Sequence, residues 1–325
     1  MRTYDVISIG DTTLDVFLEL EEETKVISDP RSRKRYLGLV FAEKIPVKKF
    51  TSIPAVGNSA NVAVGTSRLA LKTAFYTHLG DDSIGEEMRS ILVQEGVAPE
   101  YIQRDKGKAS NFSAVLNYKA ERTILVHHEH RKYRLPKFAP ARWVYFSSVA
   151  PGHEKLHSQI PLYIKKTGAK LAFNPGSFQL HEGASGLKKI LAVSTVLFCN
   201  RQEAQDIVGR EMDIKKLLEK LRGLGPEIAV ITDGPKGSYS YDGERFLFLK
   251  IFPAPLVERT GAGDAYSTGF ISALAHGKDV GEAMRWGTIN SASVIQRIGA
   301  REGLLKKKEM AKMVAARPRF QPRQL

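Results

Sequence analysis

Short apolar runs alternate with stretches of helical spacing over the second half of the chain. The apolar runs lie at 143–146, 170–173, 196–199 and 228–232. The stretches between them that have helical spacing lie at 154–167, 201–208 and 214–224. Apolar runs of this length are typical of strands that are buried on both faces. The alternation therefore predicts an α/β fold whose central sheet is mostly parallel and is flanked by helices on both faces.

The first half of the chain contains similar elements and two segments that interrupt them. We expect a strand over 2–9, a small-residue helix over 58–70, a strand over 76–79, and a helix that begins with a capping box of Ser83 and Glu86. Segments at about 12–50 and 105–127 mix charged and apolar positions instead. They include a probable strand at 36–41 and a hairpin around Lys119, Ala120 and Glu121, so they are expected to form antiparallel strands.

Composition limits the class of protein only broadly. With 325 residues, 42% of them hydrophobic, the chain is long enough for one large α/β domain or two ordinary ones. Its single cysteine, Cys199, excludes an intramolecular disulfide framework and lies in an apolar run. The sequence contains no signal-peptide pattern and no apolar run of membrane-spanning length. We therefore expect a cytoplasmic enzyme with no membrane partner.

The net charge of +14 is partly clustered. Residues 306–325 hold seven Lys or Arg and one Glu, and residues 31–35 contain four more basic residues. Positive charge suits anionic ligands such as ATP, and it is also common on solvated surfaces. Because the sequence shows no nucleic-acid-binding module, a nucleic-acid partner is not expected. The Pro- and Arg-rich end, 317–323, is expected to be a loose tail.

The stretch Glu258–Tyr266 carries the strongest chemical signal. Gly261, Ala262 and Gly263 are small enough for successive backbone N–H groups to point into one concavity, and the helix that follows adds its positive dipole end. Such a nest holds a phosphate, and Asp264 beside it can accept a proton from an attacking hydroxyl. The alternative is a glycine turn with a capping aspartate. The chain has neither a P-loop sequence nor the motifs of protein kinases.

Two further motifs follow predicted strands. Asn200 and Glu203 stand where the 196–199 strand ends, a place for a carboxylate that organises Mg²⁺, although the pair also forms a capping box. Thr232, Gly234 and Gly237 can let the backbone approach a nucleotide, or can form an ordinary strand turn. The run 127–130, His-His-Glu-His, suggests a metal, but no further ligand supports it, and residues 131–134 are expected to form a solvated lid edge.

These stretches together resemble the PfkB family of carbohydrate kinases, which has the ribokinase-like fold. The stretches that look like family motifs occur in family order at 10–15, 56–61, 80–85, 200–203, 232–237 and 258–264. The resemblance implies a single kinase domain over 1–305, with a small β-sheet lid formed by the segments at about 12–50 and 105–127. It leaves 306–325 as a basic C-terminal tail and suggests a homodimer through the lid.

The resemblance also implies roles for individual residues. Asp264 would be the base and 261–264 the anion hole, while Glu203 would organise Mg²⁺ through water. The residues expected to bind ATP are Asn200, Glu203, Thr232, Gly234, Gly237 and Asn290. The residues expected to bind the acceptor are Asp11, Asp15, Gly57, Asn58 and Asn61. An Arg on the lid hairpin, Arg122, could meet an anionic group or be exposed.

Two positions depart from the family pattern. Val56 replaces the first glycine of a Gly-Gly pair, and Glu258 replaces an aspartate that helps relatives hold a monovalent cation, so K⁺ is only a candidate cofactor.

The interpretation is an ATP-dependent kinase that phosphorylates a hydroxymethyl group of a sugar. The alternatives are a nucleoside kinase, which a bulkier apolar pocket near 36–41 and 112–116 would favour, and a nucleotide-binding regulator without catalysis. The sequence does not name the acceptor.

Overall fold

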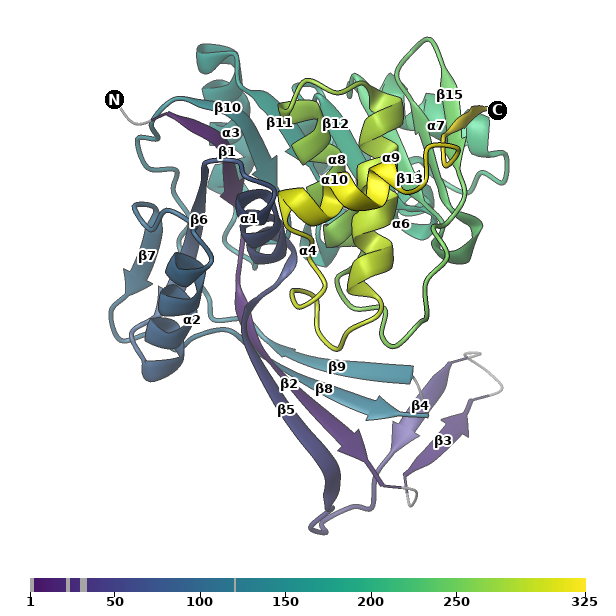
Figure 1. Ribbon diagram of the computed structural model, residues 1–325. Coiled ribbons are helices and arrows are strands. Elements are labelled where there is room, and N and C mark those ends of the chain that lie inside the picture. Colours follow the sequence, from purple (N-terminus) through teal and green to yellow (C-terminus); the bar gives the residue numbers. More distant parts are fainter. Residues whose placement is uncertain (1–2, 22–23, 30–33, 120) are drawn as a thin grey trace.

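The computed structural model is organised around one long sheet, with a smaller sheet projecting from one side (Figure 1). It describes residues 3–21, 24–29, 34–119 and 121–325. Residues 31–33 of the basic run and Ala120 of the expected hairpin turn lie outside the described residues, as do residues 1–2.

Ten strands form the main sheet within the described residues. In spatial order they are β16 (Arg323–Gln324), β15 (Phe246–Leu249), β14 (Ser238–Tyr241), β13 (Ile228–Thr232), β12 (Val196–Asn200), β11 (Lys170–Phe173), β10 (Ala141–Phe146), β1 (Tyr4–Ile9), β6 (Thr73–Gly80) and β7 (Ile102–Asp105). The pairs from β13 to β7 are parallel, and the pairs from β13 to β16 are antiparallel. The predicted mostly parallel sheet is therefore confirmed.

Helices cover both faces of this sheet. One apolar core packs under α3 (Glu154–Thr167), α5 (Gly183–Leu191), α6 (Arg201–Val208) and α7 (Ile214–Gly223). On the other face lie α1 (Asn58–Arg68), α2 (Ser83–Gln94), α8 (Ala262–Ala275), α9 (Val280–Val294) and α10 (Lys307–Ala315). Short α4 (Ser177–Leu180) and the turn η1 (Gly234–Lys236) follow strand ends. None of the helices in the described ranges has the length and apolar character needed to span a bilayer.

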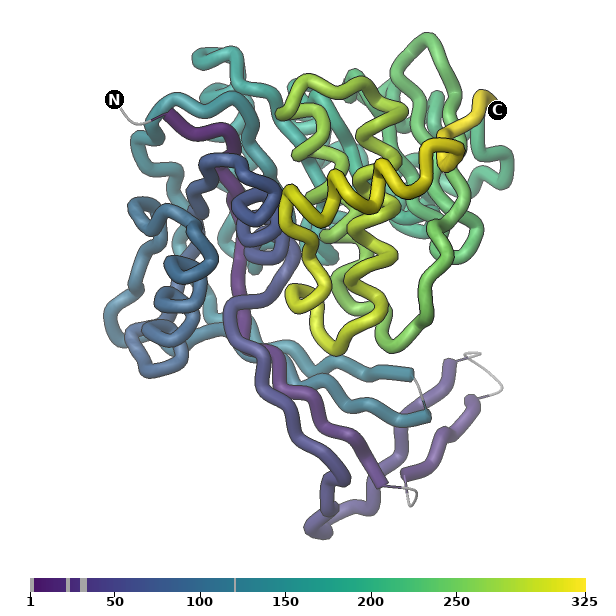
Figure 2. The backbone as a smooth tube through the Cα atoms, viewed as in Figure 1, coloured from purple at the N-terminus to yellow at the C-terminus, as the bar shows by residue number. Residues whose placement is uncertain are grey.

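The smaller sheet is the expected lid (Figure 2). Its strands lie in the order β5 (Val47–Val56), β2 (Thr13–Leu20), β8 (Phe112–Tyr118) and β9 (Glu121–His127), and β3 (Lys25–Ser28) pairs with β4 (Arg35–Gly38) beside it. The outer pairs are antiparallel, as expected, but β2 and β8 are parallel. They are parallel because β8 enters the lid from the main sheet, as β2 does, and is not joined to β2 by a hairpin.

The capping box expected at Ser83 and Glu86 is not formed. Asp82 is the N-cap of α2, and its carboxylate accepts a hydrogen bond from the Gly85 N–H at 2.7 Å. Glu86 forms an ion pair with Arg104 instead, at 2.9 Å. An aspartate at the N-cap accepts from the same orphan N–H groups as a serine would, so the N-cap lies one residue before the predicted one.

Two segments expected to be solvated or loose are packed against the main domain. Arg131 and Tyr133 are each 2% exposed, and Arg131 donates to Ala109 O at 2.6 Å and pairs with Asp105. Near the C-terminus, β16 pairs with β15, and the Phe320 ring contacts the Phe252 ring edge-on at 5.2 Å. The prediction of a loose end over 317–323 is thus wrong, because an aromatic anchor and strand pairing hold this segment.

Candidate functional site

A cavity of about 530 Å³ lies between the carboxyl ends of the parallel strands and the lid. The ends of β1 and β12, the start of α1 and the start of α8 all contribute to its lining, as do Ser113 and Arg122 from the lid. Crevices at the carboxyl ends of strands are where open α/β sheets bind their ligands. The sequence motifs therefore meet at a position suited to a small ligand.

The start of α8 has the geometry expected of an anion nest. Gly261 is the residue before the helix and has a φ of 76°, in the left-handed region that favours glycine. A Cβ atom at this position would lie 2.3 Å from the Cβ of Ala300, so a side chain is excluded for a second reason. At Gly263, by contrast, a Cβ would meet nothing within 4 Å. The first N–H groups of the helix therefore border open space in the cavity.

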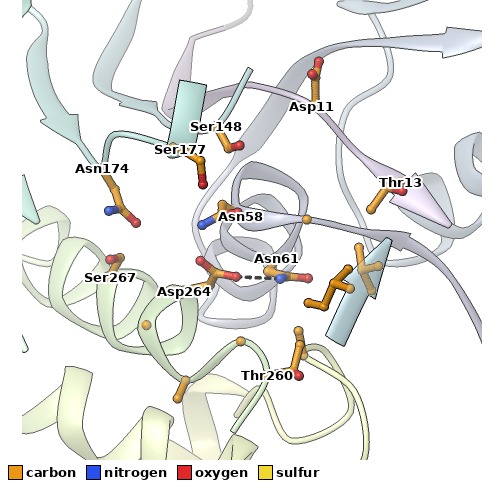
Figure 3. Close-up of a pocket in the computed structure, with 18 of the residues that line it drawn as sticks. Asp11, Thr13, Asn58, Asn61, Ser148, Asn174, Ser177, Thr260, Asp264 and Ser267 are labelled. Atoms are coloured by element: carbon orange, nitrogen blue, oxygen red, sulfur yellow. Dashed lines mark hydrogen bonds between the residues drawn. The ribbon is translucent and has the colours of Figure 1, made fainter. Parts of the chain in front are cut away.

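Asp264 lies in the first turn of α8 and is 8% exposed. The Asn61 Nδ2 donates a hydrogen bond to its Oδ2 at 2.7 Å, and Asn58 lies on its other side (Figure 3). Burial raises the pKa of Asp264, and hydrogen bonds from Asn61 and Asn58 oppose that rise. A carboxylate with a raised pKa is a stronger base, so the environment suits proton abstraction.

Asn200 and Glu203 form a reciprocal capping box and also face the cavity. The Glu203 N–H donates to Asn200 Oδ1 at 2.9 Å, and the Asn200 N–H donates to Glu203 Oε2 at 2.8 Å. Burial raises the pKa of Glu203, and the charge of Asp264 adds to that rise. A cation between the two carboxylates would relieve this repulsion, and oxygen donors are those that Mg²⁺ prefers, so the residues fit the expected metal.

A second cavity of about 130 Å³ adjoins the nest, and Ala262 and Gly263 line both cavities. Thr232, Gly234 and Gly237 line it, as expected for a nucleotide loop, together with Thr288 and Ser291 of α9. Asn290 lies outside both cavities: it is fully buried, donates to Ala265 O at 2.8 Å and accepts from the Leu305 N–H at 3.0 Å. Residues 288 and 291 share a helix face that 290 does not, but helical spacing alone does not say which face borders the cavity.

The acceptor candidates meet on the opposite side of the first cavity. Asp15, Gly57, Asn58 and Asn61 all line it. Burial raises the pKa of Asp15 to about 6, although a hydrogen bond from Ser113 acts to lower it. The sequence analysis missed several polar residues of this lining, which lie in loops after strands or on helices α4 and α8. These include Ser148, Asn174, Ser177 and Ser267.

Asp11 lines the same cavity, but its carboxylate is already hydrogen-bonded. The Tyr133 hydroxyl donates to both carboxylate oxygens at 2.8 Å, and the Ala150 N–H donates to Oδ2 at 2.8 Å. His128 lies 3.9 Å away. Asp11 therefore holds the cavity wall together, and its contacts with protein groups leave it less suited to read an acceptor than Asp15.

Glu258 is also engaged by protein groups. The Thr260 hydroxyl donates to one carboxylate oxygen, and the Gly299 N–H donates to the other at 2.7 Å. Arg122, on lid strand β9, donates to Thr260 Oγ1 at 2.8 Å and lies 4.0 Å from Glu258. This arrangement ties the lid to the loop before the nest. The two alternatives left open for Arg122 do not exclude each other, because its side chain is 38% exposed and also lies beside the Glu258 carboxylate.

The run at 127–130 does not gather metal ligands within the described residues. Within the described residues, the group whose side chains have the spacing of metal ligands is His153, His157 and Glu182. His153 precedes α3, His157 lies on it, and Glu182 precedes α5. This group is considered separately below.

Comparison with known proteins identifies the class. The fold matches Arabidopsis thaliana ribokinase, solved with ribose and ATP, at a TM-score of 0.79 and 20% identity, covering 96% of this chain and 99% of that one. The nucleoside kinase of Methanocaldococcus jannaschii gives a TM-score of 0.78 at 19% identity, covering 97% and 99%. These likenesses establish a ribokinase-like fold.

The chain belongs to the pfkB family carbohydrate kinases, because that family's model matches residues 29–307. An uncharacterized sugar kinase of Archaeoglobus fulgidus is 29% identical over 74% of this chain and 98% of its own length. A 5-dehydro-2-deoxygluconokinase of Shouchella clausii is 26% identical over 93% of each chain. The predictions of the family, of the fold and of a phosphotransferase are confirmed.

Proposed function

We propose that this protein transfers the γ-phosphoryl group of ATP to a hydroxymethyl group of a sugar, with Asp264 as the base. The observation that carries the proposal is the position of Asp264. It is buried, it stands in the first turn of the helix that starts at the glycine nest, and it faces the cavity that the acceptor candidates line. A hydroxyl held there would lie between a base and the N–H groups that bind the phosphoryl oxygens.

The acceptor side offers donors and acceptors suited to a polyol. Asn61 donates to Asp264 through Nδ2, while its Oδ1 is buried and has no hydrogen-bond partner within the described residues. Asp15 adds a carboxylate on the lid side. A buried amide oxygen without a partner is costly, and a hydroxyl of the acceptor would satisfy it. Acceptors that lack this hydroxyl would therefore be rejected.

On the nucleotide side, we assign Thr232, Gly234 and Gly237 to ATP together with Thr288 and Ser291. Glu203 and Asn200 would hold Mg²⁺, which neutralises charge on the phosphates when it is bound. Holding the phosphates in line with the acceptor hydroxyl supplies much of the rate enhancement in reactions of this type. K⁺ does not enter the proposal, since both oxygens of Glu258 accept hydrogen bonds from protein groups.

A nucleoside remains the second candidate acceptor. Ile124 and Val126 of β9 line the cavity and could contact a base, whereas residues 36–41 contribute nothing to the lining. The absence of that segment favours the smaller acceptor.

We also propose that the lid pairs with a second copy of the chain, because the side chains of Phe41, Phe50 and Leu125 are 95%, 62% and 56% exposed. Light scattering would test this assembly.

The deciding experiment is an ADP-release assay with Mg-ATP and a panel of sugars, sugar phosphates, sugar acids and nucleosides. We expect one polyol class to give turnover, and Asp264→Asn to lower kcat by about 10³-fold while ATP affinity stays within about threefold. Turnover of the acceptor by Asp264→Asn within threefold of the wild type would refute the assignment of the base. Turnover of nucleosides alone would replace the sugar by the second candidate.

A further inference from the structure

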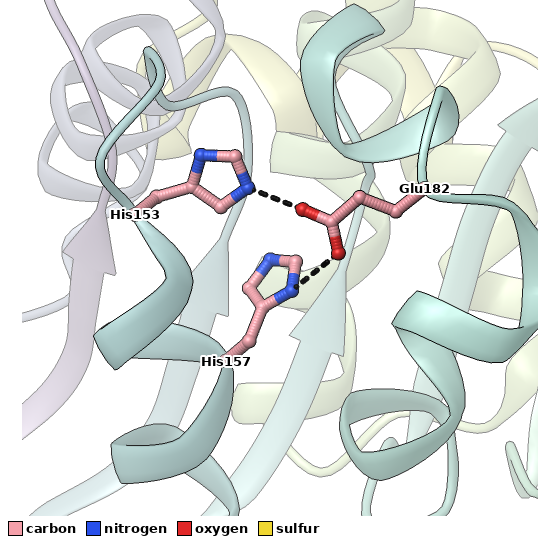
Figure 4. A group of neighbouring side chains, drawn as sticks. All are labelled: His153, His157 and Glu182. Atoms are coloured by element: carbon pink, nitrogen blue, oxygen red, sulfur yellow. Dashed lines mark hydrogen bonds and ion pairs between the residues drawn. The ribbon is translucent and has the colours of Figure 1, made fainter.

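Two buried histidines, His153 and His157, share the carboxylate of Glu182 (Figure 4). His153 precedes α3, His157 is one turn further along it, and Glu182 precedes α5. The histidines are 4% and 7% exposed. The roles assigned above to the catalytic and nucleotide-binding residues leave this group unexplained. Its hydrogen bonds can be followed in both directions to residues that line the cavity.

The direction of the bonds is fixed at one end by Gly176, which lines the cavity. Its N–H donates to Gln179 Oε1 at 2.7 Å, so the amide nitrogen of Gln179 must face His157 Nε2, at 3.4 Å. That ring nitrogen is therefore an acceptor, and the proton of a neutral His157 is on Nδ1. Nδ1 donates to Glu182 Oε2 at 3.2 Å. Burial lowers the pKa of His157, in agreement with the neutral form.

The other end is fixed by Asp11. The Ala150 N–H donates to Asp11 Oδ2 at 2.8 Å, and the Ala150 carbonyl accepts from His153 Nδ1 at 2.8 Å. His153 Nε2 then lies 2.6 Å from Glu182 Oε1. Two lone pairs at this separation would repel each other, so one proton must lie between them. It belongs either to an imidazolium beside a carboxylate or to a carboxylic acid beside an imidazole.

The same three residues have the spacing of a metal site, but their surroundings do not fit one. A metal at His157 would take the lone pair of Nδ1 and move the proton to Nε2. Nε2 would then face the donating amide of Gln179, which Gly176 prevents from turning over. The arrangement therefore favours a hydrogen-bonded cluster that holds a proton.

We propose that His153, Glu182, His157 and Gln179 are positioning residues, which hold two walls of the acceptor cavity in register through the proton shared by His153 and Glu182. The walls are residues 148–150 and 174–177, and the chain of bonds runs from Asp11 to Gly176 without a break. This role rests on the proposed function of the cavity. The titratable groups nearest the shared proton are His157 and Glu154 on α3, Asp11 after β1, and His130, whose ring lies beside Gly152.

Glutamine at position 182 tests the role of the proton, because it can complete the chain without one. Its amide nitrogen can donate to a neutral His153 and its oxygen can accept from His157. We expect Glu182→Gln to keep the acceptor KM within twofold, and Glu182→Ala to raise it about tenfold with the ATP KM unchanged. Glu154→Gln, on the same helix, is the matched control.

Amide hydrogen exchange at Ala150 and Gly176, followed by NMR without any acceptor, provides a readout that does not depend on the substrate. We expect faster exchange in Glu182→Ala and wild-type rates in Glu182→Gln. Equal disturbance in both variants, or no change in Glu182→Ala, would overturn the proposal. So would visible Co²⁺ bands in the wild type that Glu182→Gln abolishes, since these would indicate a metal site. If the wild type phosphorylates no acceptor, the proposed function fails, while the exchange rates still judge the positioning role.

Discussion

The main sheet and the lid bury their residues to very different extents. In β1, every residue from Val6 to Ile9 is fully buried, whereas all seven residues of β9 in the lid are exposed. A sheet covered on both faces is held by its own core, and a small sheet with exposed strands is marginal without outside contacts. The main domain therefore supplies fixed geometry for the proposed phosphate nest, and the lid depends on the groups that contact it, which would include a bound ligand.

The largest effect on kcat expected in this comparison comes from a variant of the main domain that changes the geometry of the nest without lowering the stability of the fold. Gly263→Ala should lower kcat by about 10²-fold or more, because a methyl group would enter the space beside the N–H groups of the nest. It should not destabilise the fold, since alanine is favoured over glycine within a helix by about 0.5–1 kcal/mol. Steady-state kinetics and thermal unfolding measured on the same sample would check both points.

Gly261→Ala is the matched variant, two residues earlier. It should lower both activity and the free energy of unfolding, by about 1–2 kcal/mol or more, because of its left-handed backbone and the Ala300 contact. If both variants lost stability equally, the space beside Gly263 would not be available to a ligand.

A smaller effect is expected for the contact that joins the lid to the main domain. Arg122→Ala should lower kcat/KM by about tenfold, because the lid loses its hydrogen bond to Thr260, while the melting temperature stays nearly constant, since exposed pairs contribute little stability. Lys48→Ala removes another lid cation, paired with Glu19 at 3.4 Å, and is the control. Equal kinetics for the two variants would mean that Arg122 is an ordinary surface residue.

Asp15 allows the lid side to be probed by pH. Its pKa is about 6 in the folded protein and 3.8 in the unfolded chain, so the folded state binds more protons between these values. The free energy of unfolding should therefore fall as pH rises from about 4 to 6, by on the order of 1 kcal/mol for a partly exposed group. Asp15→Asn should remove this decrease and Glu19→Gln should not, as measured by urea unfolding at several pH values.

The smallest effect on catalysis is expected from the C-terminal segment. Removal of 317–325 should keep kcat/KM for ATP and acceptor within about threefold, because the segment contributes no lining residue to either cavity. It should lower the melting temperature by several degrees, since β16 and the Phe320 contact are lost. Loss of ATP affinity would contradict the expectation for kcat/KM. An unchanged melting temperature would contradict the expectation that the segment stabilises the fold.

Sequence patterns predicted best what is decided locally. The helices expected at 154–167 and 201–208 coincide with α3 and α6, and the predicted main-sheet strands were found, because apolar runs and helical spacing are short-range signals. The lid strand Val47–Val56 was missed, since its first four residues are all exposed and two of them are lysines. Its pairing with β2, like the docking of Phe320, depends on partners far away in the sequence.

The candidate site divides in the same way. The nest, Asp264 and the pair of Asn200 and Glu203 were predictable, because each is a short motif at the end of a predicted element. To choose Thr288 instead of Asn290 as a residue of the nucleotide side, one needs the orientation of α9, which the sequence does not give. That Asp11 is a wall residue could not be predicted, because its partners Tyr133 and Ala150 are far away in the sequence and only the tertiary structure brings them to it.

Three of the four places where the chain passes between the main domain and the lid are linked to one another. Thr12 donates to Val56 O at 2.9 Å, and Asn111 donates to Thr12 O at 3.2 Å. Gly57 follows Val56 directly and starts α1, which carries Asn61. A rotation of the lid about these crossings would therefore turn the first residues of α1 with it and alter the hydrogen bond from Asn61 to Asp264. In engineering terms, the lid would act as a lever on the proposed base, so that occupancy of the proposed acceptor cavity and readiness for proton transfer would be mechanically linked.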